Sequence, residues 1–132
     1  MSDEAQEKLR TAEEHMDNFY RALAREELDK AGEFLRAAVN ALVHAVASAR
    51  GERLPAKHGP VRDFIRKLAG ELGDKTLWDA FRDAEKLHAN FYSSGIFENE
   101  ELRTMIDGVV HKLVRPLYEL AERELRDWAS ST

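Results

Sequence analysis

The sequence predicts an all-α fold, an antiparallel up-and-down bundle of about five helices. Apolar residues recur at helical spacing along most of the chain. No segment alternates apolar and polar residues with the β-branched enrichment that is typical of a strand. The breaks between the helical segments are short, which favours antiparallel packing of successive helices. At 132 residues the chain is expected to form one domain, spanning residues 1–132.

The first two helices are expected over residues 3–24 and from residue 26 or 27 to residue 49. Two acidic residues open the first helix and suit the positive end of its dipole. No glycine or proline separates the two segments, but one unbroken helix would be far longer than helices usually are. We therefore place a tight turn near Arg25. Gly51 is a stop signal for the second helix.

A short third helix is expected after a loop at residues 50–59. Pro60 fits the first turn of this helix, because the N–H that proline lacks would have no partner there. The helix is expected to end near Gly70 to Gly73.

The last two helices are longer. Asp74 is expected to cap the fourth helix, which ends at residues 93–95. Asn99 or a neighbour is expected to cap the fifth helix, which runs to about Ala129. Pro116 should kink this helix, because it removes one backbone hydrogen bond and clashes with the preceding turn.

The composition excludes several classes of protein. Without cysteine the chain forms no disulfide scaffold and no thiolate zinc site. No stretch approaches the roughly 18 apolar residues of a membrane span, and the N-terminal residues are too charged for a signal peptide. We expect a cytoplasmic protein that does not bind membranes. A net charge of −5 also argues against broad wrapping of nucleic acid.

The second helix is apolar almost all round, which predicts that it is buried at the centre of the bundle. Its polar residues Arg36, Asn40 and His44 share one narrow stripe. This stripe is either a solvated edge of the helix or the wall of a polar groove or symmetric interface.

Basic residues cluster in residues 50–67, where six basic residues face two acidic ones. Such a local excess of positive charge could bind phosphate. The predicted phosphate-binding residues are Arg53, Lys57, Arg62 and Arg66. The alternative interpretation is a solvated loop and outer helix face.

Metal binding has little support, and no metal or other cofactor is expected. A di-metal carboxylate bundle needs two Glu-x-x-His motifs, and the chain has one, which ends at His88. A three-histidine site stays open as an alternative, because His15, His44, His88 and His111 fall on four predicted helices.

The segment at residues 87–92, Leu-His-Ala-Asn-Phe-Tyr, resembles the L-H-x-N-F-Y signature of the archaeal paralogous-repeat (PaREP) family. That family is usually grouped with the HEPN superfamily of helical bundles. The alanine-rich second helix and the basic loop that follows it are also similar, and the resemblance covers roughly residues 8–125. It implies a HEPN-like bundle, often a homodimer.

The resemblance also implies a candidate active site. Many HEPN domains are metal-independent endoribonucleases with an Arg-x(4–6)-His motif, which Arg82 and His88 fit. Three such pairs occur in the chain, and only the flanking Asn-Phe-Tyr selects this one. His88 would act as general base on the RNA 2′-hydroxyl and Arg82 would stabilise the phosphoryl oxygens. Glu85, Asn90 and Tyr92 would support them.

Two functions therefore stay open. The first is an RNA-directed module, either RNA-binding or a metal-independent endoribonuclease of the toxin–antitoxin or defence type. The second is a non-catalytic homodimeric module that binds a protein or a nucleotide. In the second, His88 and Tyr92 only hold their helix in place and Arg82 pairs with Glu85. The expected partners are a second copy of the chain, which would pack against residues 92–97, RNA, or a cognate nucleotidyltransferase-type protein.

Overall fold

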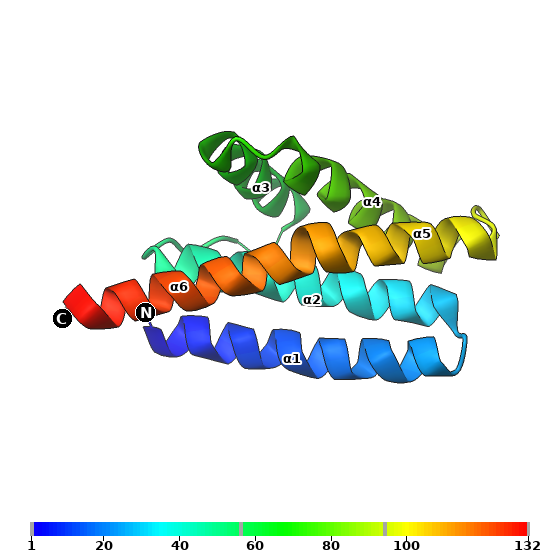
Figure 1. Cartoon of the computed structure of the whole chain (residues 1–132), viewed down its shortest axis with the longest axis horizontal. Coiled ribbons are helices and arrows are strands. Elements are labelled where there is room, and N and C mark those ends of the chain that lie inside the picture. The colour runs from blue at the N-terminus through cyan, green and yellow to red at the C-terminus, as the bar shows by residue number, and fades with distance from the viewer. Residues whose placement is uncertain (1, 56, 94, 132) are drawn as a thin grey trace.

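The structure is a computed structural model that describes residues 2–55, 57–93 and 95–131. Throughout these ranges the regular structure is helical and contains no strand, which confirms the predicted all-α fold. The α-helices are α1 (Ser2–Ala24), α2 (Leu28–Ala49), α3 (His58–Leu72), α4 (Lys75–Tyr92), α5 (Asn99–Val109) and α6 (Arg115–Ser131). A π-helical turn at Val110–Val114 joins α5 to α6, so that the two form one continuous rod (Figure 1).

Helix α2 is the centre of the bundle, as its apolar sequence predicts. It contacts every other helix, and most of its side chains are buried. In Figure 1, α1, α2 and the α5–α6 rod run along the long axis of the molecule, and α1 lies antiparallel to α2. Helices α3 and α4 form a hairpin that crosses this layer. None of the helices in the described ranges combines the length and apolar character that a membrane crossing requires.

The turn between α1 and α2 lies where the sequence places it. Glu26 adopts a left-handed backbone conformation with φ 58°, and the N–H of Glu27 donates to the carbonyl of Ala22 at 3.0 Å. A left-handed conformation costs a residue with a side chain about 1–2 kcal/mol. The turn therefore forms without the glycine that usually marks such a position.

The other helix ends also follow local signals. Gly51 and Gly73 take left-handed conformations after α2 and α3. Asp74 caps α4 by accepting a hydrogen bond of 3.0 Å from the backbone N–H of Thr76. For α5 the cap is Glu98, the neighbour of Asn99, and its N–H donates to the carboxylate of Glu101 at 3.1 Å.

Some details differ from the sequence expectation. Helix α2 begins at Leu28, one or two residues later than expected. Helix α3 begins at His58 rather than Pro60, but the proline still lies in the first turn, where its missing N–H has no consequence. The helix expected over residues 99–129 does continue past Pro116, but its hydrogen bonding changes to a π-helical turn just before the proline. The N–H of Arg115 donates to the carbonyl of Val110, and this wider turn accommodates the bond that proline cannot make.

Candidate functional site

The 87–92 segment forms the end of α4 that packs against the first half of α2. Asn90 is 1% exposed, and both ends of its amide are bonded. Its Nδ2 donates to Oδ1 of Asp29 at 2.7 Å, and its Oδ1 accepts a hydrogen bond of 3.3 Å from the N–H of Phe97. Asn90 therefore fixes α4 to α2 and also to the segment that leads into α5. In the proposed site it can act only as a positioning residue.

His88 is bonded to a second acidic residue on the same face of α2. Its Nδ1 lies 2.8 Å and 3.0 Å from the two carboxylate oxygens of Glu33, and its side chain is 33% exposed. A carboxylate accepts hydrogen bonds but does not donate them, so Nδ1 carries the hydrogen. In the neutral ring the other nitrogen, Nε2, then keeps its lone pair. This arrangement is suited to a general base.

A glycine allows the two helices to come close enough for these bonds. Gly32 precedes Glu33 on α2, and a Cβ at this position would lie 3.3 Å from Cβ and Cδ2 of Leu87. Such a contact is tighter than ordinary van der Waals packing. A side chain at position 32 would therefore push α4 away from α2, together with His88 and Asn90.

The structure does not join Arg82 to Glu85. Arg82 is exposed, and it forms no ion pair with any residue that the structure describes. The carboxylate of Glu85 lies 3.7 Å from Nε of Arg62. Tyr92 is 72% exposed, and its ring meets the His88 ring edge-on, with 5.0 Å between the centroids. Both Arg82 and Tyr92 are thus accessible to a ligand.

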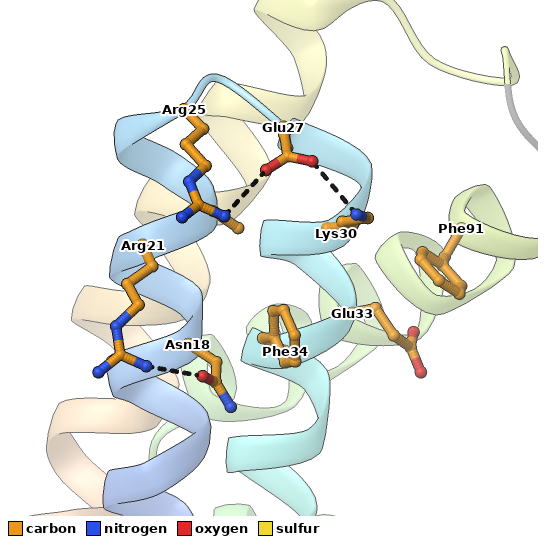
Figure 2. Close-up of a pocket in the computed structure, with 9 residues that line it drawn as sticks. Asn18, Arg21, Arg25, Glu27, Lys30, Glu33, Phe34 and Phe91 are labelled. Carbon is orange, nitrogen blue, oxygen red and sulfur yellow. Dashed lines mark hydrogen bonds and ion pairs between the residues drawn. The ribbon is translucent and has the colours of Figure 1, made fainter.

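A pocket of about 340 Å³ lies beside the His88–Glu33 pair, and Glu33 forms part of its wall (Figure 2). Two phenyl rings line it, Phe34 from α2 and Phe91 from α4. Its cationic side chains are Arg21 from the last turn of α1, Arg25 from the turn that follows, and Lys30 from α2. Aromatic and cationic groups in one pocket suit a ligand that combines a flat ring with a phosphate.

The cations of this pocket are only loosely engaged. Glu27 lies 4.0 Å from Arg25 and 3.3 Å from Lys30, in pairs that are largely exposed. Arg21 donates to the side-chain oxygen of Asn18 at 3.1 Å. The sequence pattern does not predict this pocket. Its one local signal is the four-residue spacing of Arg21, in the last turn of α1, and Arg25, in the turn that follows.

The residues predicted to bind phosphate have different neighbours. Arg53 lies 3.3 Å from Glu4, and Arg62 lies 3.7 Å from Glu85. The Arg66 guanidinium lies over the ring of Trp78, 4.7 Å from its centroid. Lys57 is exposed. The local excess of positive charge is therefore partly balanced by carboxylates from α1 and α4.

Arg50 is the most tightly bound cation of that stretch. Its Nε donates to Glu124 at 2.9 Å and its Nη1 donates to Glu71 at 2.9 Å, while Nη2 lies 2.8 Å from Glu124. The hydrogen bond to Glu124 is the main reason why the pKa of Arg50 is raised above its ordinary value. Because Glu71 is on α3 and Glu124 on α6, Arg50 ties three helices together.

The histidines do not gather around a common point. His15 and His44 line a groove between α1 and α2, and Nε2 of His111 lies 3.3 Å from Asp107. Within residues 2–55, 57–93 and 95–131, no three histidine, aspartate or glutamate side chains are grouped as a metal site. The three-histidine alternative has no support from this part of the chain.

Comparison with known proteins gives one match. The family model described as the archaeal PaREP1/PaREP8 family matches residues 3–104, which is more than half of the chain and includes the 87–92 segment. No curated protein sequence and no solved structure matches the chain significantly.

Proposed function

The chain belongs to the archaeal PaREP1/PaREP8 family, and from that premise we propose that it is a HEPN-like module that binds single-stranded RNA and cleaves it without a metal ion. The observation that carries this proposal is the bond between Glu33 and Nδ1 of His88, next to a pocket with three cations and two phenyl rings. This arrangement is consistent with a proton-transfer group, His88, that lies next to a surface able to bind a nucleotide.

The pocket of Figure 2 provides the binding step. Proteins hold single-stranded nucleic acid by stacking bases on aromatic rings and by placing cations along the backbone. Phe34 and Phe91 are available for stacking, while Arg21, Arg25 and Lys30 are available for phosphate. Because these contacts do not read base edges, the proposed binding has little sequence preference and weakens with salt.

The His88–Glu33 pair provides the cleavage step. Nε2 of His88 takes the proton from an RNA 2′-hydroxyl, while Glu33 holds Nδ1 and stabilises the imidazolium that forms. The 2′-oxygen bonds to the adjacent phosphorus and the bond to the 5′-oxygen breaks, with a proton from water going to the leaving oxygen. The products carry a 2′,3′-cyclic phosphate and a 5′-hydroxyl.

Arg82 is the proposed electrostatic partner of this reaction. Six residues on a helix correspond to about 9 Å along its axis and 120° around it, so Arg82 and His88 do not lie side by side. They can still contact one RNA strand at neighbouring positions. The exposed guanidinium would bind phosphoryl oxygens as charge develops on them, and the exposed Tyr92 hydroxyl would help to place the phosphate.

The test is cleavage of an unstructured RNA in EDTA by the wild-type chain and by His88→Ala and Arg82→Ala. We expect His88→Ala to slow cleavage by about 10²–10⁴-fold, the range for loss of a general base. His111→Ala is the matched control, because His111 is also a half-exposed helical histidine paired with a carboxylate. Equal cleavage by all variants identifies a contaminant, and an absence of both cleavage and RNA retardation contradicts the proposal.

The binding step is tested separately by retardation of RNA at low salt. Phe91→Ala should weaken RNA binding by about 5–100-fold, which corresponds to the 1–3 kcal/mol that stacking of one base contributes. Phe97→Ala is a poor control because it disturbs the core, so the matched control is Tyr20→Ala, an exposed aromatic residue outside the pocket. Equal loss of binding in both variants would argue against stacking at Phe91.

A non-catalytic homodimer is the second candidate, and one observation favours it. Tyr92 at the end of α4 and Ile96 in the segment before α5 are 72% and 52% exposed, although both are large and mainly apolar. Such a patch is typical of an interaction surface. Phe97 packs against the core instead, and Ser94 lies outside the described residues.

This candidate is tested by light scattering at micromolar concentration. A dimer that the double variant Tyr92→Ser, Ile96→Ser converts to a monomer, without any binding or cleavage of RNA, would favour the second candidate. A monomer at this concentration would leave only a protein partner to cover the patch, and would contradict the homodimer.

A further inference from the structure

A second groove lies between α1 and α2, and it shares no lining residue with the pocket of Figure 2. Its volume is about 480 Å³. One wall is the polar stripe of α2, formed by Arg36, Asn40 and His44, and the facing wall is the first half of α1. The stripe is thus the wall of a polar groove, and the proposed RNA site leaves it without a role.

The charge of this groove is opposite to that of the whole protein. Lys8, Arg36 and Arg53 bring three positive charges to its lining, against the one carboxylate of Glu4. That carboxylate lies 3.3 Å from Arg53, in a pair that is 84% exposed on the arginine side. In a chain with a net charge of −5, this is a local surplus of positive charge that would attract an anion.

Two imidazole rings and an amide supply hydrogen bonds in the same groove. Nδ1 of His15 is buried and has no hydrogen-bond partner in the part of the chain that the structure describes. Native structures leave few such nitrogens unpaired, and each one calls for an explanation. If the His15 ring rotates toward the groove, a bound ligand would supply the missing hydrogen-bond partner of Nδ1.

The pKa of His44 should change when an anion binds in the groove. Burial lowers its pKa below the ordinary value, the charge of Lys8 lowers the pKa further, and the charge of Glu4 opposes this. The ring is therefore neutral at pH 7. A phosphate oxygen bound beside it would favour the protonated form and would raise the pKa again.

We propose that the groove between α1 and α2 binds a phosphate monoester, such as a sugar phosphate. The dianionic terminal phosphate matches the surplus of positive charge that Lys8 and Arg53 bring, and Asn40 and His44 bond to its oxygens or to neighbouring hydroxyls. The volume lies within the range of small-molecule sites. No phenyl, phenol or indole ring is among the described lining residues, so a nucleobase would find nothing but imidazole to stack on.

The experiment follows the imidazole C–H resonances of the full chain by NMR during titration with ribose 5-phosphate at constant ionic strength. The resonance of His44 should move, and its pKa should rise. The other charged or titratable groups that face the groove are the same with and without the ligand; they are Glu4, Lys8, His15, Arg36 and Arg53. Lys8→Gln should weaken the affinity at least 5-fold. Lys67→Gln is the matched control, because Lys67 is an exposed lysine on α3 outside the groove.

Dimethyl phosphate is the second probe, because it separates a terminal phosphate from a phosphodiester backbone. Weaker binding of dimethyl phosphate than of ribose 5-phosphate supports the proposal. Equal binding overturns the assignment to a monoester. A His44 resonance that ignores millimolar ribose 5-phosphate, or that responds equally in wild type and Lys8→Gln, overturns the site itself. None of these outcomes depends on whether the chain cleaves RNA.

Discussion

The two ends of α2 use similar interactions for different purposes. At its first turns Asp29 and Glu33 bind Asn90 and His88 of α4, and just beyond its last turn Arg50 binds two glutamates of α3 and α6. In both places a charged side chain bonds across helices. At the Arg50 end all three guanidinium nitrogens face carboxylates. At the His88 end one ring nitrogen is held, and a third of the side chain stays accessible.

This difference distinguishes a contact that only stabilises the fold from one that also leaves an atom available for a ligand. Each guanidinium nitrogen of Arg50 already faces a carboxylate, so this cation is less available to a ligand. The His88 ring is held through Nδ1 only, so Nε2 can take part in proton transfer. The His88 end also has a pocket beside it with cations and phenyl rings. We therefore propose that the Arg50 end serves stability alone, whereas the His88 end, which Asn90 also stabilises, provides the functional site.

The largest expected effect on stability is at Asn90. In Asn90→Ala, Asp29 and the N–H of Phe97 lose a partner that is buried. Leaving such groups unpaired should lower the free energy of unfolding by about 2–4 kcal/mol. Urea unfolding measures this, with the exposed Asn99→Ala as control. A loss no greater than that of the control would show that the bonds of Asn90 do not hold α4 in place.

The next effect is at the opposite end of α2. Arg50→Ala removes hydrogen bonds to Glu124 and Glu71 and leaves both carboxylates without their cation, and we expect a loss of about 2 kcal/mol in the free energy of unfolding. Arg53→Ala breaks only an exposed pair and should cost less than about 0.5 kcal/mol. RNA cleavage per folded molecule should be unchanged. Loss of cleavage in a folded Arg50→Ala chain would contradict the division between the two ends.

Glu33→Gln should show the reverse pattern. The amide oxygen can still accept a hydrogen bond from Nδ1 of His88, so stability should change by less than about 1 kcal/mol. The imidazolium loses its negative partner, so RNA cleavage should fall at least 10-fold. Cleavage rates and urea unfolding of the same preparation measure both. Stability that falls while cleavage persists would make Glu33 a structural residue like Glu124.

The smallest effect concerns the pH dependence of stability, and it arises from His44 in the middle of α2. Because burial lowers the pKa of His44 in the folded chain, the unfolded chain binds more protons as the pH falls below the ordinary value of 6.5. The contribution of His44 to stability is complete above that pH and is lost as the pH falls through the folded pKa. His44→Asn should therefore flatten the decline in stability between pH 7 and pH 5. An unchanged slope would show that His44 titrates as it does in the unfolded chain.

The helices could be predicted because their signals are local. Gly51, Gly73 and Asp74 act within a few residues of themselves, and the apolar periodicity of α2 is enough to place it at the centre. The π-helical turn before Pro116 was missed, because proline specifies which backbone bond is lost but not how the helix accommodates the loss. A kink and a π-helical turn can both accommodate the backbone hydrogen bond that Pro116 cannot make.

The candidate site could be predicted only on α4. His88 and Asn90 stand out in the sequence, but their partners lie 55 and 61 residues away. Helical spacing shows that Asp29 and Glu33 share a face, yet it does not show which helix that face meets. The basic stretch has partners that its sequence does not show for the same reason, since Glu4 lies 3.3 Å from Arg53 and Glu85 lies 3.7 Å from Arg62.

The central claim, that His88 acts on an RNA 2′-hydroxyl, is tested most directly by removing that hydroxyl. An RNA that is cleaved in EDTA is resynthesised with a single 2′-deoxynucleotide on the 5′ side of the cleaved bond. We predict that cleavage at that bond stops, that binding is unchanged, and that the unmodified RNA yields a 2′,3′-cyclic phosphate. Continued cleavage at the deoxy position, or a product with a 3′-hydroxyl, would contradict the assignment of His88 as general base.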